Sequence, residues 1–159
     1  MGKTPDRAVM AKVLIETQPD APEPMTMTSE FSVRVQSTAD IVTARQQGRE
    51  LAARLGFSPS DVTIIATAIL EIARNIVEYA QEGEVQISVA EDGSHSGVQI
   101  VARDEGPGIS DLSAVMRDGF STGTGLGLGL PGARRLMDEF DIASQIGKGT
   151  TVTMKKWAQ

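Results

Sequence analysis

The glycine-rich run at residues 119–132 limits the possible structure and function of this chain more than any other stretch does. It reads Gly-Phe-Ser-Thr-Gly-Thr-Gly-Leu-Gly-Leu-Gly-Leu-Pro-Gly, with glycine at every second position from 123 to 129. Glycine weakens helices and strands, so such a run is typical of backbone that takes unusual dihedral angles or approaches something closely. The alternating Leu126, Leu128 and Leu130 can hold one side of the run while the other stays bare. We therefore interpret it as a binding loop.

The residues after the run indicate what it binds. Pro131 and the stretch up to Phe140 predict a helix that opens directly after the glycines. A glycine-rich loop leading into a helix N-terminus presents free N–H groups and the positive end of the helix dipole, which together make a phosphate site. A flexible linker is the alternative. Linkers are polar Gly/Ser sequences, however, whereas this run carries leucines.

Composition narrows the possible functions. The chain has 159 residues, enough for one domain with a real core, and its lack of cysteine excludes disulfides and thiolate metal sites. Its net charge of −6 argues against nucleic acid and anionic membranes as partners. We expect neither a signal peptide nor a membrane span, and the absence of cysteine is compatible with our prediction of a cytoplasmic protein. An acidic protein can still bind a nucleotide through a metal ion and oriented amides.

Residue periodicity predicts an N-terminal tail followed by one domain. Residues 1–30 contain crowded prolines and no regular period, which predicts a disordered tail, and residues 31–159 form the domain. Alternating apolar and polar residues predict strands at 31–36, 84–90, 97–103, 140–146 and 150–154. Helical periodicity and capping residues predict helices at 41–55, 59–80, 111–117 and 131–140.

The helix predicted at 59–80 carries two polar residues on an unusual face. Its apolar stripe at positions 62–76 predicts one face against the core. On the opposite side lie Ile64, Ala68, Glu71 and Asn75. A solvated face would not carry Ile64 and Ala68. We therefore expect this face to be covered as well, with a carboxylate and an amide inside the cover.

Three short motifs accompany the loop, and each has an ordinary explanation when taken alone. Glu71 and Asn75, spaced i, i+4, can serve a hydroxyl or water and a Mg²⁺ ion, or they can be a solvated pair. Asp104, which opens a Gly-Pro-Gly turn after a strand, can accept a hydrogen bond from an exocyclic amine, or it can begin a plain turn. Gly147-Lys-Gly-Thr150 can be a simple hairpin turn. Their order and spacing together are more specific.

In chain order, the motifs at 71–75, 104–108, 123–129 and 147–150 resemble the N, G1, G2 and G3 boxes of the GHKL ATPase superfamily, which includes gyrase B, Hsp90, histidine kinases and MutL. The resemblance covers about residues 31–157. The amino-acid sequence at 71–75, 118–122 and 129–140 is similar to that of the serine/threonine kinases of bacterial partner switching. Within these, the RsbT-type switch kinases of the stressosome look closer than the anti-sigma kinases of the RsbW and SpoIIAB type.

This resemblance implies an α+β fold, namely a two-layer α/β sandwich of the Bergerat type. A mixed, mostly antiparallel sheet would be covered by helices, with ATP between the helices and the loop. Glu71 would orient or deprotonate the attacking hydroxyl, Asn75 would bind Mg²⁺, and Asp104 would bind the adenine amine. The remaining implied nucleotide-binding residues are Gly106, Gly108, Ile109, Gly123, Thr124, Gly125, Leu126, Gly127, Leu128, Gly129, Leu130 and Thr150.

The implied function is transfer of the ATP γ-phosphate to Ser or Thr of a STAS-domain protein of the anti-anti-sigma or stressosome scaffold kind. The freed kinase would then bind a second partner, either a phosphatase activator or a sigma factor. Two alternatives are an ATP-dependent module that only sequesters a sigma factor and an ATPase with a conformational cycle. Glu71 and Asn75 weigh against the first, and the lack of a further domain to move weighs against the second.

Overall fold

The computed structural model describes residues 29–117 and 129–158. Most of the expected tail at residues 1–30 therefore lies outside the described residues, and the first strand begins at Ser29, two residues before its expected start. Six of the predicted nucleotide-binding residues also lie outside: Gly123, Thr124, Gly125, Leu126, Gly127 and Leu128.

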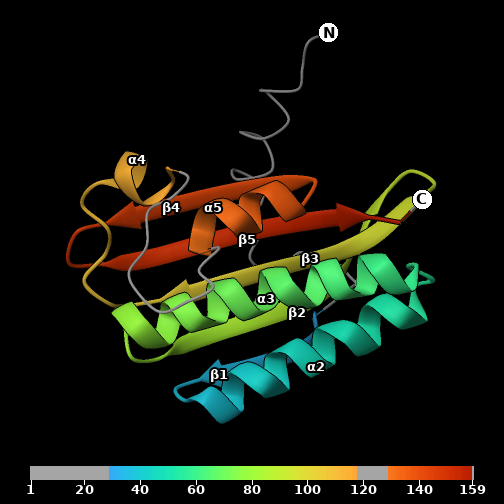
Figure 1. The fold of residues 1–159 in the computed structure, drawn as a ribbon, viewed down its shortest axis with the longest axis horizontal. Coiled ribbons are helices and arrows are strands. Elements are labelled where there is room, and N and C mark those ends of the chain that lie inside the picture. Colours follow the sequence, from blue (N-terminus) through green and yellow to red (C-terminus); the bar gives the residue numbers. More distant parts are fainter. Residues whose placement is uncertain (1–28, 118–128, 159) are drawn as a thin grey trace, which may run out of the picture.

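The described part of the chain forms helices and strands in an order close to the prediction (Figure 1). None of its helices is both long enough and apolar enough to cross a membrane. The elements are β1 (Ser29–Val35), α2 (Thr38–Arg54), α3 (Pro59–Tyr79), β2 (Gly83–Asp92), β3 (His95–Asp104), α4 (Leu112–Val115), α5 (Gly129–Leu136), β4 (Glu139–Gln145) and β5 (Gly149–Trp157).

The strands make one five-stranded sheet in the order β1-β2-β3-β5-β4. Helices α2, α3 and α5 lie side by side over one face of this sheet, so the predicted α+β two-layer sandwich is confirmed (Figure 1). All four pairings between described strands are antiparallel, so the parallel component of the expected mixed sheet does not occur among them.

Local capping explains where the two long helices begin. The Ser37 side chain accepts a hydrogen bond from the Asp40 N–H, and the Ser58 side chain accepts one from the Asp61 N–H. Each bond satisfies one of the backbone donors that a helix start leaves free. Gly56 follows α2 with a φ of +86°, a conformation that glycine adopts without strain. These boundaries follow from short stretches of sequence, as predicted.

The core lies between the sheet and α3. Val33, Val85, Ala102 and Val152 are paired across four neighbouring strands and are at most 7% exposed. Because side chains alternate between the faces of a strand, this row points to the helical layer. The apolar stripe of α3 lies against it, with the buried members Ile65, Ile69, Ile72 and Ile76.

The β2–β3 hairpin is longer than predicted. We expected residues 91–96 to connect the two strands, with His95 in the turn, but only Gly93 and Ser94 lie between β2 and β3. His95 pairs with Asp92 as the first residue of β3. The φ of +64° at Gly93 permits a two-residue turn, because glycine adopts positive φ without a steric penalty.

Helix α5 is shifted relative to the expected 131–140. It begins at Gly129 and ends at Leu136. The Asp138 N–H donates to the Lys155 carbonyl at 2.9 Å, and Glu139 pairs with Lys155 as β4 begins. Strand pairing with β5 therefore ends the helix before its local sequence would require it to stop.

Candidate functional site

Glu71 occupies a covered position on α3. Its side chain is only 5% exposed, and Ala68, one turn earlier on the same face, is fully buried. The predicted cover is therefore present, and α5 supplies contacts to α3 there. A buried carboxylate requires compensating donors or charges. Glu71 Oε1 accepts a hydrogen bond from the Gly129 N–H at 3.0 Å and lies 3.7 Å from Arg74 Nη1.

Gly129 links Glu71 to the end of the glycine-rich run. It is the first residue of α5 and has a φ of +59°. Its N–H is one of the donors that a helix start leaves without an intrahelical partner, and the Glu71 carboxylate satisfies it. The next predicted residue, Leu130, is 4% exposed and packs in the hydrophobic core. The N-box carboxylate and the C-terminal end of the G2 run are thus brought together.

Asn75 lies one turn beyond Glu71 on the same helix face and is half-buried. Its side-chain amide oxygen is a ligand type that Mg²⁺ accepts. Within residues 29–117 and 129–158 there is no group of three His, Cys, Asp or Glu side chains that could hold a metal. The Asn75 oxygen is therefore compatible with its predicted role as a Mg²⁺ ligand.

Asp104 ends β3 and begins the G1 turn. Its Oδ1 accepts a hydrogen bond from the Gly106 N–H at 2.9 Å, which fixes the carboxylate in an Asx turn. A Cβ on Gly106 would stand 2.6 Å from the Ala80 Cβ, just past α3. The glycine is therefore required by close packing against the end of α3, whereas the resemblance implies only a role in shaping the nucleotide pocket.

The G1 and G3 motifs are in direct contact at one end of the sheet. Asp104 and Thr150 are paired residues on β3 and β5. The Gly147 N–H donates to the Pro107 carbonyl at 2.8 Å. A Cβ on Gly149, whose φ is +112°, would collide with the Asp104 carbonyl oxygen, and one on Gly108 would collide with the carbonyl of Gln145. The register of the sheet thus places the two predicted adenine-binding residues, Asp104 and Thr150, next to each other.

Ser144 joins these two motifs, and the sequence analysis missed it. Its Oγ accepts a hydrogen bond from the Ile109 N–H at 2.8 Å and lies 2.8 Å from the Oγ1 of the buried Thr150. Its position offers a signal that could have been used. Phe140, Ile142 and Ser144 alternate on the more buried side of β4, so Ser144 is the polar member of an otherwise apolar row.

The two ends of the candidate site are connected along α3. Glu71 and Ala80 are nine residues apart, which is about 13 Å along a helix. Ala80 packs against Gly106, so the Asp104 turn lies at one end of this path and the Glu71–Gly129 contact at the other. Such a layout suits an elongated ligand with a hydrogen-bonding ring at one end and an anionic group at the other.

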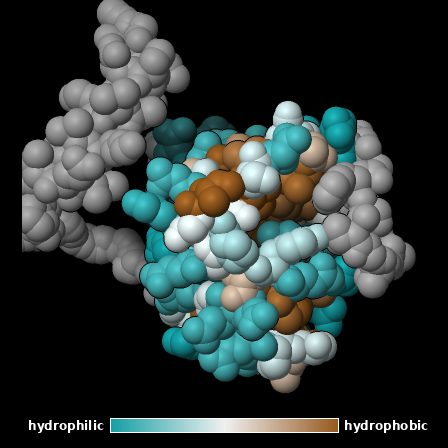
Figure 2. Space-filling model, turned by 90° about the vertical axis from the view of Figure 1, so that its left-hand side faces the viewer, coloured by the Kyte–Doolittle hydropathy of each residue, from teal (hydrophilic) through white to brown (hydrophobic). Residues whose placement is uncertain are grey.

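The surface at the end of the sheet that carries these two turns mixes apolar and polar groups (Figure 2). Seen from the left-hand side of Figure 1, where the G1 turn and the β4–β5 turn lie, hydrophobic surface gathers among hydrophilic residues (Figure 2). Ile146, in the β4–β5 turn, is 65% exposed. The turn end therefore combines polar hydrogen-bonding groups with exposed apolar side chains.

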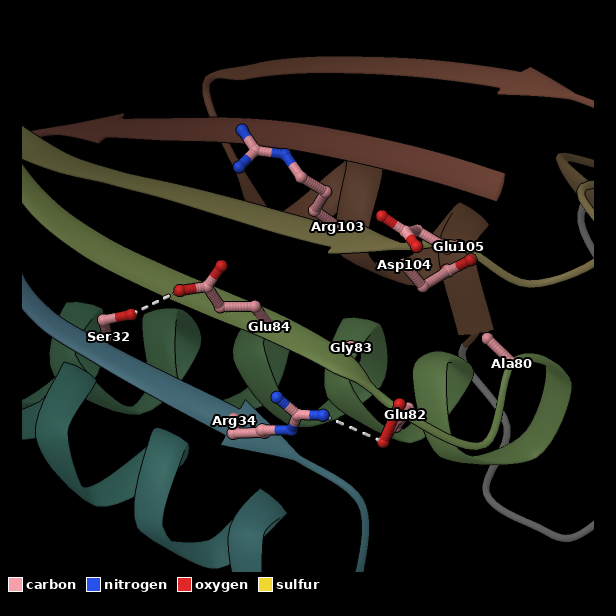
Figure 3. A pocket seen from close by; sticks show the side chains of 9 residues that line it. All are labelled: Ser32, Arg34, Ala80, Glu82, Gly83, Glu84, Arg103, Asp104 and Glu105. Carbon is pink, nitrogen blue, oxygen red and sulfur yellow. Dashed lines mark hydrogen bonds and ion pairs between the residues drawn. The ribbon is translucent and has the colours of Figure 1, made fainter. Parts of the chain in front are cut away.

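A hollow of about 640 Å³ lies behind the G1 turn, on the sheet face that the helices leave open (Figure 3). Some of its charged residues have partners within the hollow. Arg34 Nη2 lies 3.1 Å from Glu82 Oε1, and Ser32 Oγ donates to Glu84 Oε2 at 2.6 Å. Among the described residues that line it, Asp104 is the one predicted site residue, so this hollow is not the candidate site.

Comparison with known proteins agrees with this geometry. A family model described as the histidine kinase-like ATPase domain matches residues 35–156. The serine/threonine-protein kinase RsbT of Bacillus subtilis (strain 168) is 50% identical over 131 residues, which are 82% of this chain and 98% of that protein.

More distant relatives carry a different name. The anti-sigma F factor of Geobacillus stearothermophilus is 35% identical over 112 residues, covering 65% of this chain and 75% of the relative. That of Thermoanaerobacter sp. (strain X514) is 30% identical over 118 residues, covering 72% and 82%. The solved structure of the mycobacterial sensor histidine kinase MprB aligns at a TM-score of 0.49 and 16% identity, covering 83% of this chain and 99% of that one.

Proposed function

Because the chain belongs to the histidine kinase-like ATPase domain family and, within it, to the serine/threonine protein kinases, we propose that it phosphorylates a STAS-domain protein at Ser or Thr. The observation that carries this proposal is the buried Glu71 carboxylate, which accepts the Gly129 N–H at 3.0 Å. It puts a group able to accept a proton beside the helix start at which phosphates are favoured.

Different residues of the site bind the adenine ring and the metal ion. At one end, the Asp104 carboxylate accepts a hydrogen bond from the exocyclic amine of adenine, while its Oδ1 also accepts one from the Gly106 N–H. Thr150 is the residue paired with Asp104 on the neighbouring strand. Toward the other end, the Asn75 amide oxygen holds Mg²⁺. When bound, ATP supplies the transferable phosphoryl group and Mg²⁺ neutralises its charge.

Glu71 acts on the protein substrate. In phosphoryl transfer the protein mainly positions the reactants and stabilises charge, and one residue orients the attacking hydroxyl or accepts its proton. Glu71 suits this role because burial excludes water from its carboxylate, while the Gly129 N–H restricts its orientation.

The proposed partner follows from the relatives and from the chain's charge. Relatives named as a serine/threonine kinase and as anti-sigma factors support a partner-switching cycle, and we propose that it runs in the cytoplasm. The kinase binds its unphosphorylated STAS antagonist, phosphorylates it and releases it. It is then free for a second partner, either a phosphatase activator or a sigma factor. A net charge of −6 supports protein partners over nucleic acid.

Phosphorylation of candidate STAS proteins tests this proposal. The protein is incubated with Mg-ATP and each candidate, and phosphorylated residues are located by mass spectrometry. Glu71→Gln is the control, because glutamine keeps an oxygen that can accept the Gly129 N–H but cannot take up a proton at neutral pH. We expect transfer to slow by about 10²–10⁴ in this variant. No phosphoserine or phosphothreonine on any STAS protein would contradict the proposal.

Sequestration without phosphorylation is the second candidate, and the names of the anti-sigma F relatives favour it. It predicts a nucleotide-dependent complex whose partner is never modified. The Glu71→Gln variant would then bind and release its partner as the wild type does. The same mass spectra, recorded beside a dissociation measurement, distinguish the two functions.

A further inference from the structure

Among the residues that the structure describes, the contacts of the Glu71 carboxylate fall on one of its two oxygens. Oε1 accepts the Gly129 N–H at 3.0 Å and also lies 3.7 Å from Arg74 Nη1. In the described ranges, 29–117 and 129–158, no hydrogen-bond partner contacts Oε2. A hydrogen bond from α5 and a cation on α3 thus meet at the same oxygen, and no described residue is hydrogen-bonded to the second one.

Arg74 lies beside the Glu71 carboxylate. It lies one helical turn after Glu71, at the i, i+3 spacing that brings side chains together. Its side chain is 32% exposed while that of Glu71 is 5% exposed, so a partly hydrated cation faces a buried carboxylate. A distance of 3.7 Å is an ion pair without a well-formed hydrogen bond. The cation therefore lies against the oxygen that the Gly129 N–H also contacts, where it can restrict the orientation of the carboxylate.

We propose that Arg74 is a positioning residue for phosphoryl transfer. Together with the Gly129 N–H it holds Oε1, so that Oε2 is the oxygen that accepts the proton of the substrate hydroxyl. In that step the hydroxyl oxygen forms a new bond to phosphorus, its proton passes to Oε2, and the old P–O bond breaks with its electron pair on the departing ADP. This inference rests on the proposed kinase function.

Kinetics of three variants test the role of Arg74. Arg74→Ala should lower kcat about tenfold, within the range of coupling between side chains in contact. KM for ATP and for the STAS protein should stay within about twofold, because Arg74 is proposed to act on the proton acceptor and not on binding. Arg74→Lys keeps the positive charge and should recover most of the loss. In the Glu71→Gln background, Arg74→Ala should cause no further loss, because its effect requires the carboxylate.

The amide resonance of Gly129 gives a second readout that needs no nucleotide. Its N–H donates to Glu71 Oε1, so its proton chemical shift reports where the carboxylate lies. Arg74→Ala should move this resonance in the same direction as Glu71→Gln does, and Arg74→Lys should move it less. Lys155→Ala is the matched control, because Lys155 also lies 3.7 Å from its carboxylate partner, Glu139, and is 31% exposed. It should leave both the resonance and kcat unchanged.

The outcomes separate this inference from the function on which it rests. In one outcome, the wild type phosphorylates its partner and Glu71→Gln does not, but Arg74→Ala has the kcat of the wild type or leaves the Gly129 resonance in place. The positioning role is then wrong and the kinase proposal stands. An equal loss from Arg74→Ala in both the wild-type and Glu71→Gln backgrounds would also overturn it. Absence of transfer by the wild type would overturn both.

Discussion

At the scale of single residues, Asp104 and Glu71 of the candidate site each have a structural partner as well as a proposed role. Asp104 binds its own turn through Oδ1, and Glu71 caps the start of α5 through Oε1. Ser144 connects the Ile109 N–H with the Thr150 hydroxyl. These partners restrict each group to one orientation, which reduces the entropy lost when a ligand or substrate binds.

Asp104→Asn should weaken ATP binding while leaving the fold intact. The amide keeps an oxygen that can accept the Gly106 N–H, but its NH₂ group would face the donor amine of adenine. We expect the dissociation constant for Mg-ATP to rise about 10- to 100-fold, the cost of a lost hydrogen bond to a charged group. Calorimetric titration measures it, with the exposed neighbour Glu105→Gln as the control. If folded Asp104→Asn binds Mg-ATP as tightly as the wild type does, Asp104 is not part of the ATP-binding site.

Ser144→Ala should destabilise the protein by about 1–3 kcal/mol. The substitution removes the acceptor of the Ile109 N–H and the neighbour of the buried Thr150 hydroxyl, and unsatisfied buried groups carry such costs. Urea denaturation measures the free energy of unfolding. Ser113→Ala, at an exposed position of α4, should change it by less than about 0.5 kcal/mol. Equal stability of the two variants would argue against Ser144 as the link between the motifs.

At the scale of elements, the site depends on the β4–β5 hairpin being pressed against the turn that follows β3. The Gly147 N–H binds the Pro107 carbonyl, and Gly149 lies directly against the Asp104 carbonyl. Both glycines have positive φ, but only Gly149 has a backbone neighbour in the place where a side chain would go. The hairpin therefore controls where the predicted adenine-binding carboxylate is held.

Gly149→Ala should be more destabilising than Gly147→Ala. Both substitutions force a side chain into positive φ, which costs about 1–2 kcal/mol. At Gly149 the new Cβ would also displace the Asp104 carbonyl, whereas nothing lies within 4 Å of a Cβ at Gly147. We expect Gly149→Ala to weaken Mg-ATP binding too, because Asp104 moves. Thermal denaturation and titration of both variants measure the difference, and equal losses would show that the contact with Asp104 is unimportant.

At the scale of the whole molecule, helices α2, α3 and α5 lie over one face of the sheet, and they leave the opposite face open (Figure 1). The candidate site extends along α3 on the helical side, whereas the open face presents paired charges such as Arg34 and Glu82 (Figures 1 and 3). The site therefore lies within the helical layer and not on the sheet surface. A partner protein that reaches Glu71 must approach from that side.

Slowing the chemistry should lengthen the life of the partner complex. If the kinase releases its STAS antagonist only after phosphorylating it, Glu71→Gln should form the same complex and hold it longer in Mg-ATP. Surface-immobilised antagonist and a dissociation-rate measurement give the lifetime, and omission of ATP is the control, because wild type and variant should then dissociate alike. Faster or unchanged release by Glu71→Gln in Mg-ATP would contradict a cycle driven by phosphorylation.

The sequence alone was enough for features that depend on neighbouring residues. The serine caps at Ser37 and Ser58, the alternation in the strands and the i, i+4 pair Glu71 and Asn75 all act within a few positions, so they can be recognised without tertiary structure. The expected cover over Glu71 could also be inferred, because Ala68 would be out of place on a solvated face.

Only the tertiary structure decided which distant segments meet. The strand order β1-β2-β3-β5-β4, the early end of α5 at Leu136 and the contact between Ile109 and Ser144 depend on pairings between distant residues. The same is true of the glycine at position 106, which is required by Ala80. Local periodicity contains no information about such neighbours, because the free energy that selects them comes from packing and hydrogen bonds formed only when the whole chain folds.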